Sequence, residues 1–412
     1  MNDPQLAELF SNAFDFALLL IPVVLPFLLI KVFVSLWIEY VRTNFISKNE
    51  YTLLEIIPPQ TMIKTPAAME LFLVALYQTS GESTWIDKYY LGKVRAWFSL
   101  EMVSIDGTFH FYIWTRKNLK KYIESQLYAE FPGLEMHEVD DYAKKVLKAH
   151  DGKHSIFGAE LALVKPDPYP IKTYIDYGMD KEIEEERVID PITPVVEFMS
   201  TLEKGHQAWI QIIVRAHRKE DTDPKSWFKK IDFWKETAAS EIKKIQDESL
   251  VKEGDSVRTV NKTKGQEDRI SSLERSVSKL SFDTGIRLMY VAENEVFDGL
   301  NIGGLIGTFK QYGADDRNSF FPNRVTDVDY PWQDISGRRV KMWKREMLEA
   351  YKERAYFFKK YPDIFGLNKR KYFILNTEEL ATIFHFPGIT SQAPGLQKVK
   401  SKRAAPPANL PI

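Results

Sequence analysis

The chain has 412 residues, with 56 Lys and Arg against 57 Asp and Glu, 44% hydrophobic residues and no cysteine. The near-zero net charge excludes the globally basic composition of proteins that coat nucleic acid. The lack of cysteine excludes disulfides, thiolate nucleophiles and Cys-based zinc or iron–sulfur centres. The length allows two or three domains, and the composition is that of a globular protein.

Residues 1–49 contain a long apolar run. From Phe16 to Ile38, Lys31 is the only charged residue, and a run of this length can cross a bilayer as a helix. Prolines within it are tolerated in bilayer helices. We therefore predict a transmembrane helix over about residues 14–38. Its anchor residues are Phe16, Leu20, Pro22, Pro26, Leu29 and Trp37.

A secretory signal peptide and a buried core helix are the alternatives for this run. A signal peptide needs a basic start and a small-residue cleavage site, but "MNDPQLAEL" is acidic and no such site follows. Acidic residues precede the run, and basic residues follow it at Arg42, Lys48 and Lys64. The positive-inside rule then predicts a single-pass protein of the cell inner membrane, with most of the chain in the cytoplasm.

Residues 50–145 have the pattern of an α/β unit. A strand over 50–59 is followed by a helix with a proline in its first turn. Alternating apolar residues predict strands on both sides of Asp106-Gly107, a two-residue hairpin turn. A helix over 116–133 and a strand over 134–139 complete a βαββαβ order, which is ferredoxin-like.

Residues 146–335 repeat this order in a longer form. Strands are expected over 156–165 and 169–176, and a helical insertion at about residues 225–281 separates the two later strands. Between the inserted helices, residues 248–266 are polar and expected to be mobile. The inserted arm is predicted to dock on its own domain or on a partner. The predicted fold class is α+β: a transmembrane helix followed by two ferredoxin-like units, the second with a helical insertion.

Residues 336–390 are predicted to form a helix and then a strand–helix pair, before a Pro/Ala-rich tail over 391–412. In the last helix an Asn N-cap and a Glu three residues later form a capping box, and an apolar face follows. We predict that this helix docks on a partner and that the tail acts as a linker. The docking residues are Asn376, Glu379, Leu380, Ile383 and Phe384.

Motifs of catalysis are not found. "GGLIGTFK" lacks the Gly-Lys-Ser/Thr of a phosphate-binding loop, and "DGKHS" lacks its earlier glycine. His150 and His154 have the spacing of a helical metal clamp, but Gly152 disfavours a helix there and no third ligand is evident. We therefore predict no catalytic residue, no metal ligand and no cofactor.

A βαββαβ unit can also bind RNA through aromatic side chains on its third strand. The strand "GTFHFYIW" alternates such residues, with Phe109 and Phe111 as the candidate nucleic-acid face and His110, Tyr112 and Trp114 opposite. The Lys/Arg-Gly start of the RNA-binding motif is missing. We favour a sheet packed by helices on one face and by a neighbour on the other.

Several stretches together resemble a known family. They include "LLEIIPP", "KVRAWFSLEMVSIDGTFHFYI" and "FILNTEELATIFHFPG". They are similar to membrane-anchored proteins of candidate-phyla (Patescibacteria) bacteria, in which this region precedes, or is encoded beside, a motor ATPase. That motor resembles the HerA-like ATPases of type IV secretion and conjugation. The present chain lacks the phosphate-binding loop, so the resemblance transfers no catalytic residue.

The resemblance implies a non-enzymatic component of a type IV secretion or conjugation-like translocation machine. It would tether a P-loop ATPase, supplied in trans, at the cytoplasmic face of the membrane, and we expect a homo-oligomer. The alternatives are a membrane-tethered nucleic-acid-binding module and an envelope scaffold unrelated to a motor.

Overall fold

The computed structural model describes residues 4–59, 65–146, 152–180, 189–219, 221–222, 230–248, 250–253, 256–259, 262–328, 330–358, 372–388 and Gly395. The chain divides into two compact units. The first contains residues 1–49, 80–95 and 357–370, and the second contains residues 50–79, 96–356 and 371–412. Apart from residues 80–95, both predicted α/β regions therefore lie in the second unit.

The first unit is built on α1 (Pro4–Ser47), which is accompanied by the short helix α3 (Trp85–Tyr89). The indole Nε1 of Trp37 donates to the carbonyl oxygen of Tyr89 at 2.8 Å. A Cβ on Gly92 would lie 2.2 Å from the carbonyl oxygen of Val41, so only glycine allows the loop after α3 to approach α1 this closely. These contacts hold α3 against the C-terminal part of α1.

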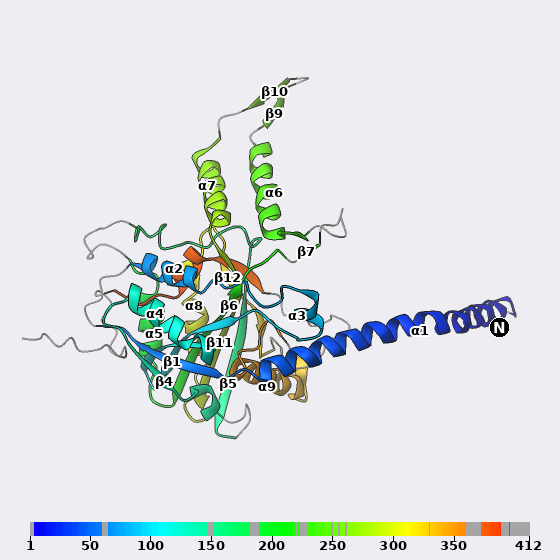
Figure 1. Ribbon diagram of the computed structural model, residues 1–412, viewed down its shortest axis with the longest axis horizontal. Helices are drawn as coiled ribbons and strands as arrows, with labels where there is room; N and C mark the ends of the chain where they lie inside the picture. The colour runs from blue at the N-terminus through cyan, green and yellow to red at the C-terminus, as the bar shows by residue number, and fades with distance from the viewer. Residues whose placement is uncertain are drawn as a thin grey trace, which may run out of the picture. The chain divides into compact units, whose positions relative to one another are not determined.

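The second unit is organised by one nine-stranded sheet (Figure 1). Eight strands follow the order β12-β5-β11-β6-β2-β3-β1-β4, and β13 pairs with β11 beyond the end of β5. All pairs between them are antiparallel. The strands are β1 (Tyr51–Ile57), β2 (Trp97–Ile105), β3 (Thr108–Arg116), β4 (Glu135–Val139), β5 (His154–Leu163), β6 (His206–Ala216), β11 (Ser281–Glu293), β12 (Phe320–Val325) and β13 (Phe373–Asn376).

Each half of this sheet has the same internal order. In the half made by β1 to β4, the spatial order is β4-β1-β3-β2, and in the other half it is β12-β5-β11-β6. In both halves the fourth strand lies beside the first, the third follows, and the second ends the half. The two halves are joined where β2 pairs with β6 along nine residue pairs from Trp97 to Ile105.

One face of the sheet is apolar and is covered by helices. The core on this face includes Phe98, Leu100 and Phe111 from the strands, all at most 1% exposed. The helices that supply its other side are α2 (Pro66–Ala75), α4 (Lys120–Glu130), α5 (Thr193–Ser200), α8 (Leu300–Gly307) and α10 (Thr377–Ile383). The apolar face thus forms one continuous core across both halves of the sheet.

The opposite face is covered by η2 (Tyr142–Lys145) and by α9 (Arg338–Lys352) with the residues that follow it. Tyr142 packs edge-on against Trp209 of β6, with ring centroids 5.3 Å apart, and Trp209 also contacts Tyr351 of α9. Trp209 is fully buried. Helical elements of the same unit therefore cover both faces of the central strands, whereas the sequence predicted helices on one face and a neighbour on the other.

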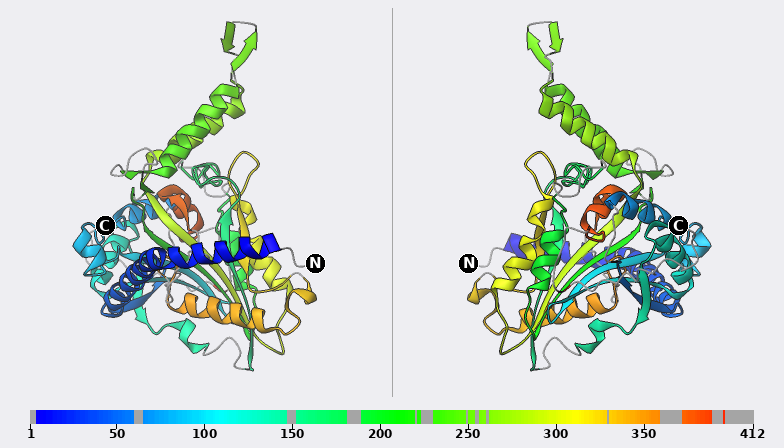
Figure 2. Two further views of the ribbon diagram at one scale, coloured as in Figure 1. Left: turned by 90° about the vertical axis from the view of Figure 1, so that its right-hand side faces the viewer. Right: turned by 90° about the vertical axis from the view of Figure 1, so that its left-hand side faces the viewer.

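The insertion between β6 and β11 is a helical arm (Figure 2). We use this name for α6 (Phe233–Glu248), α7 (Lys264–Ser278) and the ribbon of β9 (Leu250–Glu253) and β10 (Ser256–Thr259) between them. The two helices lie side by side, and Ile245, Ile270 and Leu273 form their shared apolar contact. A second small ribbon pairs β7 (Asp221–Thr222) with β8 (Lys230–Ile231).

The mixed α/β class, the N-terminal apolar helix and the helical insertion are confirmed. The strand expected over 169–176 is wrong, because side chains rather than a neighbouring strand bind its backbone. The N–H of Ile171 donates to Glu379, and the N–H of Tyr174 donates to Thr382 Oγ1. The strands β9 and β10 within the polar segment 248–266 were not predicted.

Gly285 of β11 offers a test of the packing on the second face. A Cβ there would lie 2.4 to 2.5 Å from ring carbons of Tyr356, which is 4% exposed. Gly285→Ala is expected to lower the free energy of unfolding by about 1–3 kcal/mol through this overlap, although alanine otherwise stabilises a strand relative to glycine. Urea unfolding of the detergent-solubilised protein measures the change.

The control is Gly303→Ala in α8, because a Cβ at Gly303 meets open space. Removing a helical glycine there should raise stability by up to about 1 kcal/mol. Equal effects of the two substitutions would contradict the packing argument.

Candidate functional site at the base of the helical arm

The predicted capping box at the start of α10 is present. The Asn376 side chain accepts from the N–H of Glu379 at 2.9 Å, and the Glu379 carboxylate accepts from the N–H of Asn376 at 2.9 Å. Burial raises the pKa of Glu379 to about 8, although the N–H groups of Asn376 and Ile171 oppose this shift. The helix therefore begins where the sequence predicted, but inside the protein.

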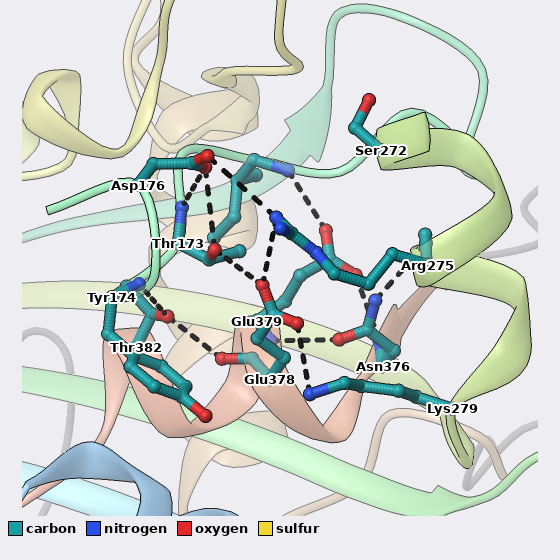
Figure 3. A network of polar contacts seen from close by, with 12 residues as sticks. Thr173, Tyr174, Asp176, Ser272, Arg275, Lys279, Asn376, Glu378, Glu379 and Thr382 are labelled. Atoms are coloured by element: carbon teal, nitrogen blue, oxygen red, sulfur yellow. Dashed lines mark hydrogen bonds and ion pairs between the residues drawn. The ribbon is translucent and has the colours of Figure 1, made fainter. Parts of the chain in front are cut away.

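The neighbouring residue Glu378 connects α10 to the end of the arm (Figure 3). Its carboxylate pairs with Arg275 at 3.3 Å and with Lys279 at 3.0 Å, and it accepts from the Thr173 hydroxyl at 2.5 Å. Lys279 also reaches Glu70 of α2 at 2.7 Å. Glu378 is 2% exposed, so these are shielded ion pairs that salt screens less than surface pairs.

The charges at this junction agree with the helix dipoles. Glu378 lies in the first turn of α10, and the cations Arg275 and Lys279 lie at the end of α7. Anions at helix N-termini and cations at helix C-termini are both favourable. Asn376 adds a bond to Ser276 of α7 at 3.1 Å. The C-terminal helix of the arm is thus tied to α10 and α2.

The other helix of the arm is held by a second cluster around His217, just after β6. Its ring binds Asp283 of β11 at 2.6 Å and Asp232 at 3.4 Å. Asp232 precedes α6, and its carboxylate accepts from the N–H of Lys235 in the first turn of that helix. Arg215 donates to the same Asp283 at 2.8 Å. Burial lowers the pKa of His217, but Asp232 and Asp283 outweigh it and raise that pKa to about 9.

A third polar cluster lies on the second face of the sheet. The strand register aligns Glu160, Arg287, Gln211 and Glu101 in one row across β5, β11, β6 and β2. Arg287 binds Glu160 at 2.9 Å and Gln211 at 3.1 Å, and Gln211 binds Glu101 at 3.1 Å. We call these four residues the polar row. It crosses the seam between the two halves of the sheet.

Arg354 closes this row from the opposite side. It follows α9 with a positive φ of 48°, and its guanidinium binds Glu101 through two bonds of 3.0 and 3.1 Å. It also binds Asp141 of the segment leading into η2. Burial lowers the pKa of Arg354, but the carboxylates of Glu101 and Asp141 outweigh it and hold that pKa above its ordinary value. An arginine with two carboxylate partners can occupy the interior.

The chemistry that these clusters support is structural pairing. In each one, carboxylates face guanidinium, ammonium or imidazole groups at hydrogen-bond distance. Within the residues that the structure describes, no group of three or more His, Asp or Glu side chains is arranged to hold a metal ion. His154 begins β5, and His150 lies outside the described residues.

The predicted nucleic-acid face is wrong as a surface. Phe109 and Phe111 are at most 1% exposed and belong to the helix-covered core, where Phe111 contacts Phe384 and Phe386 edge-on. On the opposite face, Tyr112 and Trp114 are also buried. Stacked bases cannot reach either set in this conformation.

The prediction that the helix after Asn376 docks on a partner is corrected in the same way. The residues Leu380, Ile383 and Phe384 are fully buried within the unit that contains them, and α10 packs on α2. Its docking is therefore intramolecular. Of the predicted linker tail, Gly395 alone is described, and its carbonyl accepts from the N–H of Phe109 at 2.9 Å.

The predicted anchor residues all lie within α1. Pro22, Leu29 and Trp37 are exposed along the helix, whereas the side chains of Phe16 and Leu20 lie outside the described part. One segment of α1, Val24–Ser47, is long and apolar enough to cross a membrane by length and composition.

Sequence reasoning missed Glu378, His217 and Arg354. One signal was available for the polar row, since Glu101, Gln211 and Arg287 are each flanked on both sides by an apolar residue within a strand. A charged residue inside such a strand needs a buried partner. No local pattern identifies that partner, because Arg354 is 253 residues from Glu101.

Comparison with known proteins gives one family match. The sequence profile of a domain of unknown function (DUF8128) matches residues 46–359. The matched range contains the arm and all sheet strands except β13, and it ends shortly after α9. No curated protein matches the chain.

Arg354→Met is expected to lower the free energy of unfolding by about 3–5 kcal/mol, because it leaves Glu101 and Asp141 buried without their cation. The control is Lys117→Met, which removes an exposed pair with Glu50 and should change the stability little. Urea titration of both variants measures the difference. Similar losses in both would contradict the role assigned to the polar row.

The His217 cluster predicts a pH dependence of stability. The folded-state pKa of about 9 exceeds the ordinary value of 6.5, so the stabilising contribution is complete below pH 6.5 and is lost as the pH rises through 9. His217→Gln should flatten this decline in the free energy of unfolding. His137→Gln, at an exposed site of β4, should leave the decline unchanged, and an unchanged decline in His217→Gln would refute the assignment.

Proposed function

The chain belongs to the DUF8128 family, a domain of unknown function whose description names no activity. We therefore propose a function from the structure of the chain itself. The proposed function is that of a non-catalytic, membrane-anchored component that holds a partner at the membrane surface. The observation that carries it is α1, whose segment Val24–Ser47 is long and apolar enough to cross a bilayer.

The exposure of α1 supports anchoring over a core helix. The apolar side chains of Phe27, Leu29 and Phe33 are more than half exposed, and very little of the segment is buried. A core helix of the same composition would bury such side chains. At 44 residues, α1 is about 66 Å long, so it exceeds the hydrocarbon thickness and extends beyond the bilayer.

We infer that the bilayer segment ends near Trp37 rather than at Ser47. From Trp37 onward, α1 contacts the α3 region, which carries the ion pair of Asp87 and Lys93 at 2.8 Å. An ion pair of this kind is more stable in water than in the hydrocarbon of a bilayer. Exposed aromatic side chains gather in the same unit at Trp37, Tyr40, Trp85 and Tyr90, as in the aromatic belt of a membrane interface.

This assignment supports the predicted orientation. The basic residues Arg42 and Lys48 follow the proposed interface, and the positive-inside rule then directs the rest of the chain to the cytoplasm. The protein would be single-pass in the cell inner membrane. The pairing of Arg42 with the ring of Phe358, at 5.1 Å, lies within the same unit.

We further infer that the sheet consists of two ferredoxin-like units joined at β2 and β6. The order fourth, first, third, second within each half supports this, since a βαββαβ chain folded in the ferredoxin-like manner gives that order. The arm is then an insertion in the hairpin of the second unit. Both helices of the arm are held at their bases by ion pairs with the rest of the second unit. Glu378 holds α7, and His217 holds α6.

An arm that is fixed at its base can present a surface to a partner. We propose that the partner is a P-loop ATPase of the secretion and conjugation class supplied in trans, and that the protein assembles as a homo-oligomer. The resemblance noted in the sequence supports this partner. An envelope scaffold without a motor remains the second candidate, since it needs the same anchor. The nucleic-acid module has lost its support, because Phe109 and Phe111 are buried.

The proposal predicts that the full chain resists extraction from membranes by alkaline carbonate. The double variant Leu25→Arg with Leu29→Arg should become extractable, because each arginine near the centre of a transmembrane helix costs about 2.5–3.5 kcal/mol. Leu300→Arg is the matched control, since Leu300 is 82% exposed on α8. Immunoblots of membrane and soluble fractions give the readout.

Partner assignment is tested separately by co-expression with a P-loop ATPase encoded in the same gene neighbourhood. The ATPase should co-purify with the full chain in detergent. Release of the unaltered chain by carbonate would overturn the anchor. Stable anchoring without ATPase recovery would instead favour the scaffold.

A further inference from the structure

The second unit carries an exposed surface that the proposed function does not use. It is formed by η5 (Pro331–Asp334) and the first half of α9, and we call residues Tyr330–Arg345 the η5–α9 surface. Ile335 is 90% exposed and Trp332 is 69% exposed, and Tyr330 stacks on Trp332 at 4.5 Å. Exposed apolar side chains in a group mark interaction sites.

Basic residues lie beside this apolar group. Arg338, Lys341, Met342 and Arg345 recur at the spacing of one helical face, and all four are exposed. Arg339 is exposed as well and lies 5.0 Å from the ring centre of Trp343. From Tyr330 to Glu346, five basic residues stand against Asp334 and Glu346, a net charge of +3. The surface thus combines positive charge with an aromatic and aliphatic edge.

The burial of the other face of α9 explains why these residues are exposed to solvent. Its other face is buried through Met347, Leu348 and Tyr351 against the sheet. Asp334 accepts from the N–H of Val340 at 2.9 Å, which joins η5 to the first turn of α9. The basic face and the η5 edge are therefore presented together by a packed element.

We propose that the η5–α9 surface binds the anionic headgroup surface of a phospholipid membrane, with Trp332 and Ile335 entering the interfacial layer. The proposal rests on the proposed function, because α1 would bring the second unit to that surface. Lys and Arg near an anionic leaflet are attracted to it, and Trp and Tyr favour the headgroup level.

One chemical feature and the chain connectivity favour lipid over nucleic acid as the occupant. An isoleucine exposed by nine-tenths gains nothing from a phosphate backbone or from stacking on a base, which needs a π-face. It does gain from burial below the headgroups. Chain connectivity supports the same choice: soon after α9 the chain reaches Phe358, which contacts Arg42 of α1 within the first unit.

The absence of cysteine from the sequence allows one reporter thiol to be introduced. Ile335→Cys in the full chain is labelled with an environment-sensitive nitrobenzoxadiazole dye. The protein is reconstituted into vesicles of phosphatidylcholine alone or with one-third phosphatidylglycerol. Leu300→Cys is the matched control, because Leu300 is 82% exposed in the same unit without the basic face.

The dye at position 335 is expected to emit at shorter wavelength and several-fold more strongly in the phosphatidylglycerol vesicles, and to be quenched by headgroup-depth spin-labelled lipid. The dye at position 300 should show neither change. Substituting Arg338, Arg339, Lys341 and Arg345 by Gln, or raising the salt to about 0.5 M, should abolish the shift. Thermal unfolding followed by circular dichroism verifies that the four-residue variant is folded.

Several results would overturn the proposal. These are equal behaviour at positions 335 and 300, equal behaviour in both vesicle types, or a shift produced by an oligonucleotide without vesicles. Flotation separates the two proposals. Protein that floats with vesicles while position 335 stays aqueous overturns the surface and retains the anchor. Protein that floats with neither vesicle type overturns both.

Discussion

The constraint on which the second unit depends is that the central strands of one sheet, β2, β6 and β11, are buried on both faces. Its apolar face needs only helices of suitable shape. Its other face contains Glu160, Arg287, Gln211 and Glu101, and an unpaired charge there would be strongly destabilising. The register places opposite charges and an amide side by side, and Arg354 completes the pairing from the chain after α9. The segment that covers this face must therefore match it in charge as well as in shape.

The polar row also explains how α9 ends. Arg287 donates to the carbonyl oxygens of Ala350 and Ala355, and Gln211 donates to that of Tyr351. These carbonyls belong to the last turn and the residues beyond it, and those of Ala350 and Tyr351 also accept from the backbone N–H groups of Ala355 and Arg354. A guanidinium at this end also complements the helix dipole. The residue Arg354 accepts a left-handed backbone because its side chain has two carboxylate partners.

The two central strands connect this face to the arm. β6 and β11 carry Gln211 and Arg287 in the polar row, and further along they carry Arg215 and Asp283 beside His217. The same pair of strands then leads into the arm. The orientation of the arm relative to the sheet is thus set by buried ion pairs, while α10 supplies Glu378 from a segment far along the chain. An arm held at both helices suits a protein that we propose to present a partner at a membrane.

Local patterns in the sequence determined much of the fold. The Asp106-Gly107 turn, the alternation in β2 and β3, and the Asn376–Glu379 capping box were predictable because each depends on neighbours within a few residues. The apolar length of α1 was equally local. The expected strand over 169–176 failed because the N–H groups of Ile171 and Tyr174 bind side chains of α10, about 200 residues later.

Only the tertiary structure decided which surfaces are free. The period of two showed that Phe109 and Phe111 share a face, but not that helices cover it. The capping box gave the start of α10, but not that Leu380 and Phe384 would be buried in their own unit. The partner of Glu101 is 253 residues away, and burial and charge pairing over such separations depend on the packed chain. The sequence by itself therefore determined the elements, the apolar helix and the helical insertion, whereas the structure decided the ion-paired base of the arm and the exposed basic surface.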